Sequence, residues 1–147
     1  MKSAVRLAGV LLLGLVASTV TVRAQVPYNQ GTVTRVVLLS TVPGHSDALF
    51  ADLKKNIIPL WEAEKKAGLI VDFSLFLNQT SAGSNDWDIG YTLTYKNMAA
   101  LDGLPDKVYE LRMKQYGSKE DEQKVIEKRV DNVKLVSSSL LRDITLR

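Results

Sequence analysis

The sequence predicts a single α+β domain, in which helices cover one face of a four-stranded antiparallel sheet. Segments with apolar residues at period two alternate with segments where they recur every three or four residues, in the order β, α, β, β, α, α, β. The chain has 147 residues, which suits one domain. Its 46% apolar and 24% charged residues are typical of a folded chain rather than a disordered one.

The N-terminal segment has the layout of a secretory signal peptide. A basic start precedes an apolar stretch over residues 7–22, and the small side chains of Val22 and Ala24 suit cleavage after Ala24. The apolar stretch is shorter than the roughly 20 residues that a membrane-spanning helix needs. We therefore expect a leader at 1–24, one mature domain at 25–147, export to the periplasm or extracellular space, and no stable membrane anchor after cleavage.

The leader also carries all of the chain's net charge. The full sequence has 19 Lys and Arg against 16 Asp and Glu, a formal charge of +3. Three of the basic residues and none of the acidic ones fall in the leader, so the mature domain is neutral. A neutral domain lacks the positive field that phosphate binding requires, and we expect no nucleic-acid partner.

Four segments predict strands, because their apolar residues are β-branched or alternate along the chain. They are residues 32–42, 69–80, 87–95 and 140–147. The first is apolar on both faces, as in a strand buried on two sides. The second and third flank a loop rich in Ser, Gly and Asn and should form an antiparallel hairpin, with Leu75 opposite Tyr91 and Phe76 opposite Gly90.

Residues 47–67 predict a long amphipathic helix after the first strand. Apolar side chains recur there at spacings of three and four, with Ser46 expected to cap the start and Gly68 the end. Pro59 lies inside the helix and has no N–H to donate. It should therefore kink or split the helix near Asn56.

Two further helices are expected before the last strand. Pro105 suits the first turn of a helix that reaches residue 116. Ser118 with Asp121 resembles a capping box at the start of a helix over 119–134. We expect Val130 in the inner stripe of this last helix and a solvated run of mixed charges on its other face.

This order of elements matches a ferredoxin-like β-α-β-β-α-β unit with one helix added before the last strand. Such a fold leaves one face of the sheet without helices. On this face the predicted hairpin carries polar side chains and one aromatic residue, Phe76. The first strand, by contrast, places apolar side chains on the same face. Because monomers rarely leave large apolar patches uncovered, we expect a homodimer that encloses a partly polar cavity. The alternative is a monomer with an ordinary amphipathic sheet.

The strand ending in Val42-Pro43-Gly44, the long helix interrupted by Pro59 and closed by Gly68, and the two alternating strands together resemble the dimeric α+β barrel superfamily. Its members include antibiotic-biosynthesis-type monooxygenases, NIPSNAP-like proteins and EthD-like proteins. The resemblance spans residues 32–147. It implies a dimeric barrel, a small hydrophobic substrate or haem between sheet and helices and, in some members, oxygen chemistry without a cofactor. No catalytic motif of these families matches residue by residue.

His45 is the candidate catalytic residue. It is the single histidine and precedes a helix N-terminus, where the helix dipole favours the neutral imidazole. A neutral imidazole can act as a general base or donate a hydrogen bond to a carbonyl. The alternative is a turn residue that bonds the local backbone. With one histidine and no cysteine, we expect neither a metal site nor a cofactor.

Asp72 and Asp88 fall on the same predicted face of neighbouring strands. Two carboxylates can serve acid–base chemistry or bind a cation. The expected register separates them, however, and places Asp88 near Asn78. We therefore favour ion pairs with Arg35 or Arg142 over catalysis.

Phe76 and Trp61 are the aromatic residues placed best to meet a ligand. Phe76 is predicted to point away from the hairpin side chains that face the helices, and Trp61 lies near the boundary of helix and sheet. The alternative for both is core packing, which is the usual role of aromatic side chains. The predicted ligand-binding residues are Trp61, Asp72, Phe76, Asn78 and Asp88.

The leading hypothesis is an exported homodimer that holds a small apolar or aromatic molecule, either between sheet and helices or at the dimer interface. The sequence leaves two alternatives open. One is a cofactor-independent oxygenase or isomerase that uses His45. The other is a structural or partner-binding module that docks through the charged helix at 119–134.

Overall fold

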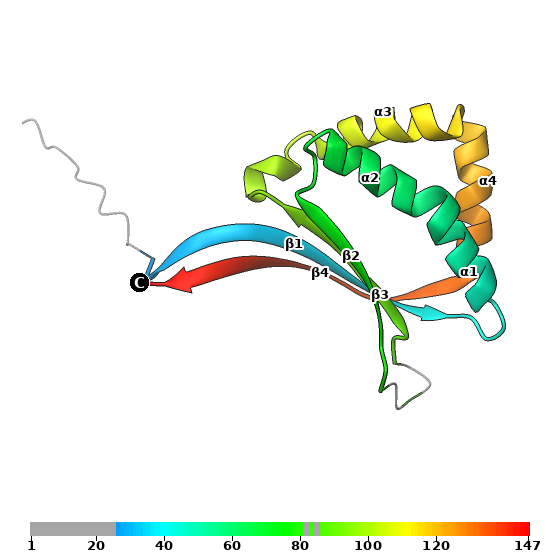
Figure 1. The fold of residues 1–147 in the computed structure, drawn as a ribbon, viewed down its shortest axis with the longest axis horizontal. Coiled ribbons are helices and arrows are strands. Elements are labelled where there is room, and N and C mark those ends of the chain that lie inside the picture. Colours follow the sequence, from blue (N-terminus) through cyan, green and yellow to red (C-terminus); the bar gives the residue numbers. More distant parts are fainter. Residues whose placement is uncertain (1–25, 81–82, 84–85) are drawn as a thin grey trace, which may run out of the picture.

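The computed structural model describes residues 26–80, 83 and 86–147, so the expected leader lies outside the described residues. The described residues form a four-stranded antiparallel sheet in the order β2-β3-β1-β4, with helices on one side (Figure 1). The predicted ferredoxin-like α+β fold is confirmed. The elements are β1 (Tyr28–Thr41), α1 (Ser46–Asp52), the π-helical segment η1 (Leu53–Ile57), α2 (Ile58–Lys66), β2 (Asp72–Leu77), β3 (Ile89–Tyr95), the 3-10 helix η2 (Met98–Leu101), α3 (Leu104–Tyr116), α4 (Lys119–Val130) and β4 (Val133–Leu146).

α1, η1 and α2 follow one another without a break and form the first helical region. The sequence predicted the end of this region correctly but not the residue that caps its start. Ser46 is already helical, and the N-cap is His45 with no side-chain capping bond, so the predicted Ser46 cap is wrong. The Pro43-Gly44 turn sets this start one residue earlier, because the His45 N–H donates to the Val42 carbonyl at 2.9 Å. Gly68 ends the region as predicted, at φ +71, and hydrogen bonds to carbonyls of the last turn complete a Schellman motif.

The β2–β3 hairpin has the predicted register. Leu75 pairs with Tyr91 and Phe76 with Gly90. β2 is shorter than the predicted 69–80, because Ile70 turns into the core before the strand begins and is only 3% exposed. The alternation of side chains therefore determines the hairpin's pairing, while its ends depend on the helix that precedes it.

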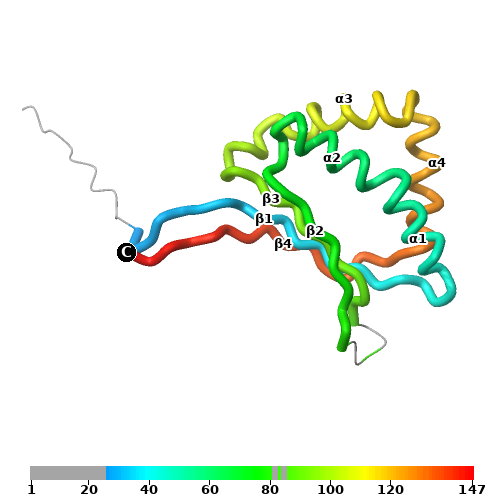
Figure 2. Tube along the Cα trace, in the orientation of Figure 1, coloured from blue at the N-terminus to red at the C-terminus, as the bar shows by residue number. Residues whose placement is uncertain are grey.

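β1 and β4 are longer than predicted and extend past the rest of the sheet (Figure 2). β1 begins to pair with β3 at Val33, whereas residues 28–30 pair only with β4. The segments 28–32 and 142–146 therefore form a two-stranded arm, which we call the β1–β4 arm. Ile144 and Leu146 on this arm are 53% and 75% exposed.

α4 is turned differently from the prediction. Val130 was expected in the inner stripe and is instead 66% exposed, so that prediction is wrong. The inward residues of this helix include Glu122 and Arg129, which find charged partners on α3 and α1. The Ser118 cap is confirmed, since its hydroxyl accepts the Asp121 N–H at 3.1 Å.

Two apolar clusters form the core between the sheet and the helices. The members of the larger cluster are Val33, Trp61, Ile70, Leu93 and Tyr95, and those of the smaller are Leu49, Leu53 and Ile89. Both clusters join α1–α2 to the β1–β3 half of the sheet. In the part of the chain that the structure describes, no helix is long and apolar enough to cross a membrane.

Candidate functional site

A cavity of about 160 Å³ lies between the sheet and the first helical region, and we call it the inner cavity. Seven of its lining side chains are apolar or aromatic and one is an arginine. They are Leu39, Leu49, Leu53, Ile57, Trp61, Tyr91, Arg129 and Val133. Such a lining, apolar with a few polar groups, is typical of small-molecule sites.

The π-helical segment η1 supplies two walls of the inner cavity. Pro59 follows it near the start of α2, and a proline cannot donate the backbone bond that an α-helix requires there. The chain instead takes a wider turn, in which the Ile58 N–H donates to the Leu53 carbonyl, five residues back. The helix therefore splits near the predicted place, and both end residues of the π segment, Leu53 and Ile57, line the cavity. Single π turns of this kind are frequent at functional sites.

Trp61 and Tyr91 form the aromatic wall of the inner cavity. Their ring centroids lie 4.8 Å apart at 42°. Burial raises the pKa of the Tyr91 phenol, although the charge of Arg35 opposes this. Tyr91 therefore stays a neutral phenol, which can donate one hydrogen bond in an otherwise apolar lining.

Arg129 is the charged residue of the inner cavity. Its Nε donates to Asp52 Oδ2 at 2.5 Å and its Nη2 to Oδ1 at 3.3 Å, which ties α4 to α1. Burial, the largest effect, lowers the pKa of Arg129, but the hydrogen bond and charge of Asp52 raise it overall. The guanidinium has five N–H groups, so this pair leaves donors that a ligand can use.

A second polar group lies next to the aromatic wall. Glu64, on α2, is only 4% exposed. Burial raises its pKa to about 6, while the charge of Arg112 acts in the opposite direction. Arg112 Nε, on α3, also lies 3.1 Å from Oε1 of the buried Glu122 on α4. The positive charge of this one arginine therefore acts on two buried glutamates, Glu64 and Glu122.

The structure does not bring the predicted site residues together. Trp61 lines the inner cavity. Asp72 lies at the surface and pairs with Lys65 at 2.7 Å, so its predicted pairing with Arg35 or Arg142 is wrong. The helical turn before β2 places Lys65 beside it, a contact that strand pairing alone does not predict.

Asp88 holds the end of the hairpin to β1, and Asn78 links the two strands of the hairpin to each other. Both Asp88 carboxylate oxygens accept the Thr41 N–H, at 2.9 and 3.0 Å, so the predicted arginine pairing is wrong here as well. Asn78 donates to the Trp87 carbonyl at 2.9 Å. These bonds fix the backbone at the end of the sheet.

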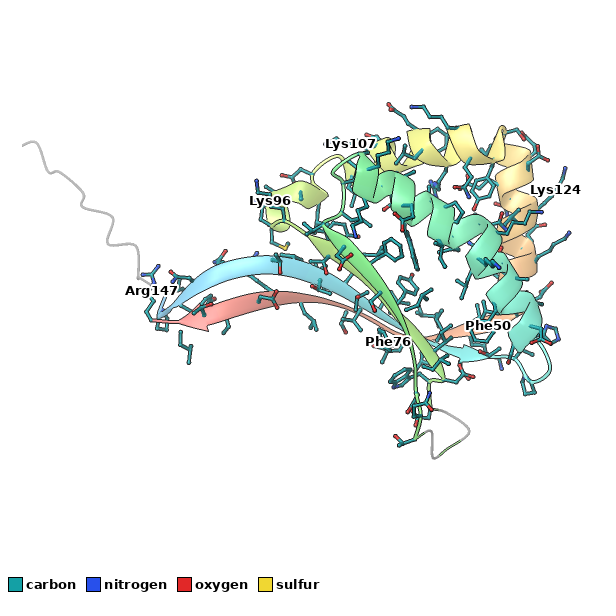
Figure 3. The ribbon with its side chains drawn as sticks, in the orientation of Figure 1. Phe50, Phe76, Lys96, Lys107, Lys124 and Arg147 are labelled. Carbon is teal, nitrogen blue, oxygen red and sulfur yellow. The ribbon has the colours of Figure 1, made fainter. Side chains whose placement is uncertain are left out.

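Phe76 and His45 also lie away from the inner cavity. Phe76 is on the helix-free face, where its ring covers Gly90 and meets Trp87 edge-on with centroids 5.5 Å apart (Figure 3). His45 is exposed, and its Nδ1 is 2.8 Å from Asn132 Oδ1. His45 thus acts within the turn before α1, and it bonds a side chain of the α4–β4 connection rather than the local backbone.

Sequence reasoning missed Arg129 as a site residue. The charged run in 119–134 suggested a solvated face, and the partner that draws Arg129 inward, Asp52, lies 77 positions earlier. The one local signal is that Arg129 follows Val125 by four residues, which places both side chains on the same face of the helix. Tyr91 was recognisable as a helix-facing aromatic residue of the hairpin, but nothing local set it apart from Tyr95.

A larger hollow of about 560 Å³ lies at the surface, where β1 ends and β4 begins. Leu135, in its lining, is 65% exposed, so the hollow is an open groove at the sheet edge. Among the described residues no group of three or more His, Cys, Asp or Glu side chains is arranged to hold a metal ion.

No protein-family model and no curated protein matches the chain. A dimeric ferredoxin-like protein from an uncultured marine organism is 15% identical, with a TM-score of 0.47 over 80% of this chain and 97% of that one. HapK from Hahella chejuensis is 10% identical, with a TM-score of 0.46 over 74% and 90%. A dimeric ferredoxin-like protein of unknown function from Jannaschia sp. is 14% identical, with a TM-score of 0.41 over 78% and 98%. These likenesses concern the fold, and the finer resemblance to monooxygenases stays a prediction.

Proposed function

We propose that this protein is an exported homodimer that binds a small, largely apolar molecule in the inner cavity. The observation that carries the proposal is the cavity itself, an apolar space of about 160 Å³ beside the rings of Trp61 and Tyr91. An apolar cavity of roughly 150 Å³ is large enough for benzene. The ligand, or the part of it that enters, is therefore one aromatic ring or a short alkyl chain.

Exposed apolar side chains support the dimer. On the helix-free face they include Leu141, which is 54% exposed, and on the β1–β4 arm Ile144 and Leu146. A two-stranded ribbon is marginally stable by itself in water. A second copy packed against the arm and the helix-free face would cover these residues.

Export rests on the sequence alone. The basic start, the apolar stretch of residues 7–22 and the small side chain of Ala24 are typical of a cleaved signal peptide. Mass spectrometry of the protein from the periplasm or the medium should find Gln25 at the N-terminus. A chain that keeps Met1 and stays in the cell contradicts export.

The two tryptophans provide a direct test of ligand binding. Trp61 lines the inner cavity, whereas Trp87 packs on Phe76 at the helix-free face. In ¹H–¹⁵N spectra, toluene or indole should shift the indole N–H signal of Trp61 and leave that of Trp87 in place. If both signals stay unchanged, or both move alike, the inner cavity is not a binding site.

A filled cavity gives the matched control. Val133 lines the inner cavity, so Val133→Phe should abolish the Trp61 shift. Val136 is 42% exposed on the same strand, so Val136→Phe adds the same ring without filling the cavity. Binding that survives Val133→Phe in a folded protein contradicts the proposal.

The dimer is tested by sedimentation. Leu141→Glu with Ile144→Glu places two charges in the proposed contact and should halve the measured mass. Val71→Glu, at a position 50% exposed just before β2, should leave the mass unchanged. A wild-type protein that sediments as a monomer at micromolar concentration contradicts the dimer.

A further inference from the structure

A third hollow, of about 310 Å³, lies on the outer side of Arg129, between α1–η1 and α4. We call it the outer cleft. Arg129 lines both the outer cleft and the inner cavity. The other residues of the outer cleft are Ala48, Ala51, Asp52, Lys55, Asn56, Val125, Lys128 and Asn132.

The outer cleft is open because the facing helix surfaces carry small side chains. Ala48 and Ala51 stand on the side of α1 that faces α4, and an alanine has only one methyl group to fill the space. Lys55 continues this side along η1, and Lys128 follows Val125 on the opposite helix at a spacing of three residues. Two long cationic side chains therefore border a space that no side chain fills.

The outer cleft has an excess of positive charge. Its cations are Lys55, Lys128 and Arg129, and its one carboxylate is Asp52. Asp52 is already occupied, since it accepts bonds from Arg129 and from Asn56 Nδ2 at 2.6 Å. Among the described residues, no carboxylate lies within 4.0 Å of either ammonium group.

Neutral donors extend the same surface. Asn132 Oδ1 is bonded to the His45 ring. The amide N–H groups of Asn132 are therefore the atoms of this side chain that can donate to a ligand in the cleft. The cleft thus combines two ammonium groups, a shared guanidinium and an amide. This set of donors suits an oxyanion rather than a cation or an apolar group.

We propose that the ligand is an amphipathic acid, whose apolar body occupies the inner cavity and whose carboxylate lies at Arg129 toward Lys55 and Lys128. The inference rests on the proposed function and adds the class of ligand to it. Arg129 lies where the body and the head of such a molecule meet. Asp52 holds the guanidinium in place there through Nε and Nη2, and Tyr116 takes a further hydrogen bond. Because a guanidinium has five N–H groups, donors beyond these bonds are left for the carboxylate.

The test compares two probes of nearly equal shape, phenylacetate and its neutral counterpart phenylacetamide. The Trp61 indole signal reports on the inner cavity, and the Trp87 signal is the internal reference. At low salt, phenylacetate should bind about tenfold more tightly than phenylacetamide, because the two exposed cations Lys55 and Lys128 each contribute a modest attraction. The difference should shrink as salt screens the cleft.

Two matched variants assign the effect to the outer cleft. Lys55→Gln with Lys128→Gln should reduce phenylacetate to the affinity of phenylacetamide and leave phenylacetamide unchanged. Lys54→Gln with Lys119→Gln removes the same charge from exposed positions outside the cleft and should preserve the preference. A preference that both variants reduce equally reflects the overall field of the protein and overturns the assignment.

The outcomes separate this inference from the proposed function. If phenylacetamide shifts the Trp61 signal and phenylacetate binds no more tightly, the inner cavity is a site but the amphipathic acid is wrong. If neither probe shifts the Trp61 signal, the proposed function fails and this inference fails with it. Tighter binding of phenylacetate that depends on Lys55 and Lys128 supports both.

Discussion

The buried carboxyl of Glu64 should make the stability of this protein depend on pH in a direction opposite to that of most acidic residues. Burial raises its pKa from 4.5 to about 6 in the folded protein, and the opposing charge of Arg112 is too weak to cancel this. The unfolded chain keeps the ordinary value. Between these two pKa values the folded state binds more protons than the unfolded state, so stability falls as pH rises.

The size of the effect follows from the pKa difference. A shift of one unit corresponds to 1.36 kcal/mol, so a rise from 4.5 to about 6 costs about 2 kcal/mol once Glu64 is ionised. The cost is absent below pH 4.5 and complete above pH 6. Glu64→Gln has no carboxyl group to ionise. As the pH rises from 4.5 to above 6, the free energy of unfolding of the variant should therefore increase by up to about 2 kcal/mol relative to that of the wild type.

Urea unfolding of both proteins at intervals from about pH 4 to about pH 8 measures this difference. Glu62→Gln is the control, because Glu62 lies on the same helix and is exposed. Its stability should run parallel to the wild type. A constant difference between Glu64→Gln and the wild type at all pH values refutes the reasoning. A variant that loses stability above pH 6 shows instead that the attraction of Arg112 outweighs the cost of burial.

Two further substitutions test the packing on either side of the sheet. Gly90→Ala places a methyl group against the Phe76 ring, closer than van der Waals contact allows. We therefore expect a loss of about 1–3 kcal/mol in urea unfolding, which Phe76→Leu should partly restore. A Gly90→Ala variant as stable as the wild type shows that the ring moves freely. Leu49→Ala, at a residue 1% exposed, should cost about 2–5 kcal/mol by the same measurement, and a loss below about 1 kcal/mol contradicts its place in the core.

The parts of the fold that short-range patterns specify were predicted correctly. Alternation alone sets the hairpin register, because a slip of one residue would turn Phe73 and Leu75 away from the helices. Gly68 and Ser118 end and begin helices through bonds within a few residues of themselves. In each case the partners are close in sequence, so the residues themselves determine the outcome.

The parts that depend on distant partners were not predictable. Residues 25–31 contain Pro27, Asn29 and Gly31 and predict an extended lead-in to a strand that begins at Thr32, yet β1 begins at Tyr28 because β4 offers it a pairing strand. α4 turns Arg129 inward instead of Val130, because Asp52 on α1 pairs with its charge. Nothing within either segment indicates its partner.

The inner cavity shows how a local feature and a global one combine. Pro59 lacks a backbone donor, and this requires an irregular turn in the preceding helix, which the sequence indicates. The turn is a π turn that puts both Leu53 and Ile57 toward the sheet. A volume of about 160 Å³ remains there because the side chains of Leu39 and Val133, on two other elements, do not fill it. A proline therefore predicts where the helix breaks, whereas the volume of the cavity depends on how side chains from seven separate elements pack around it.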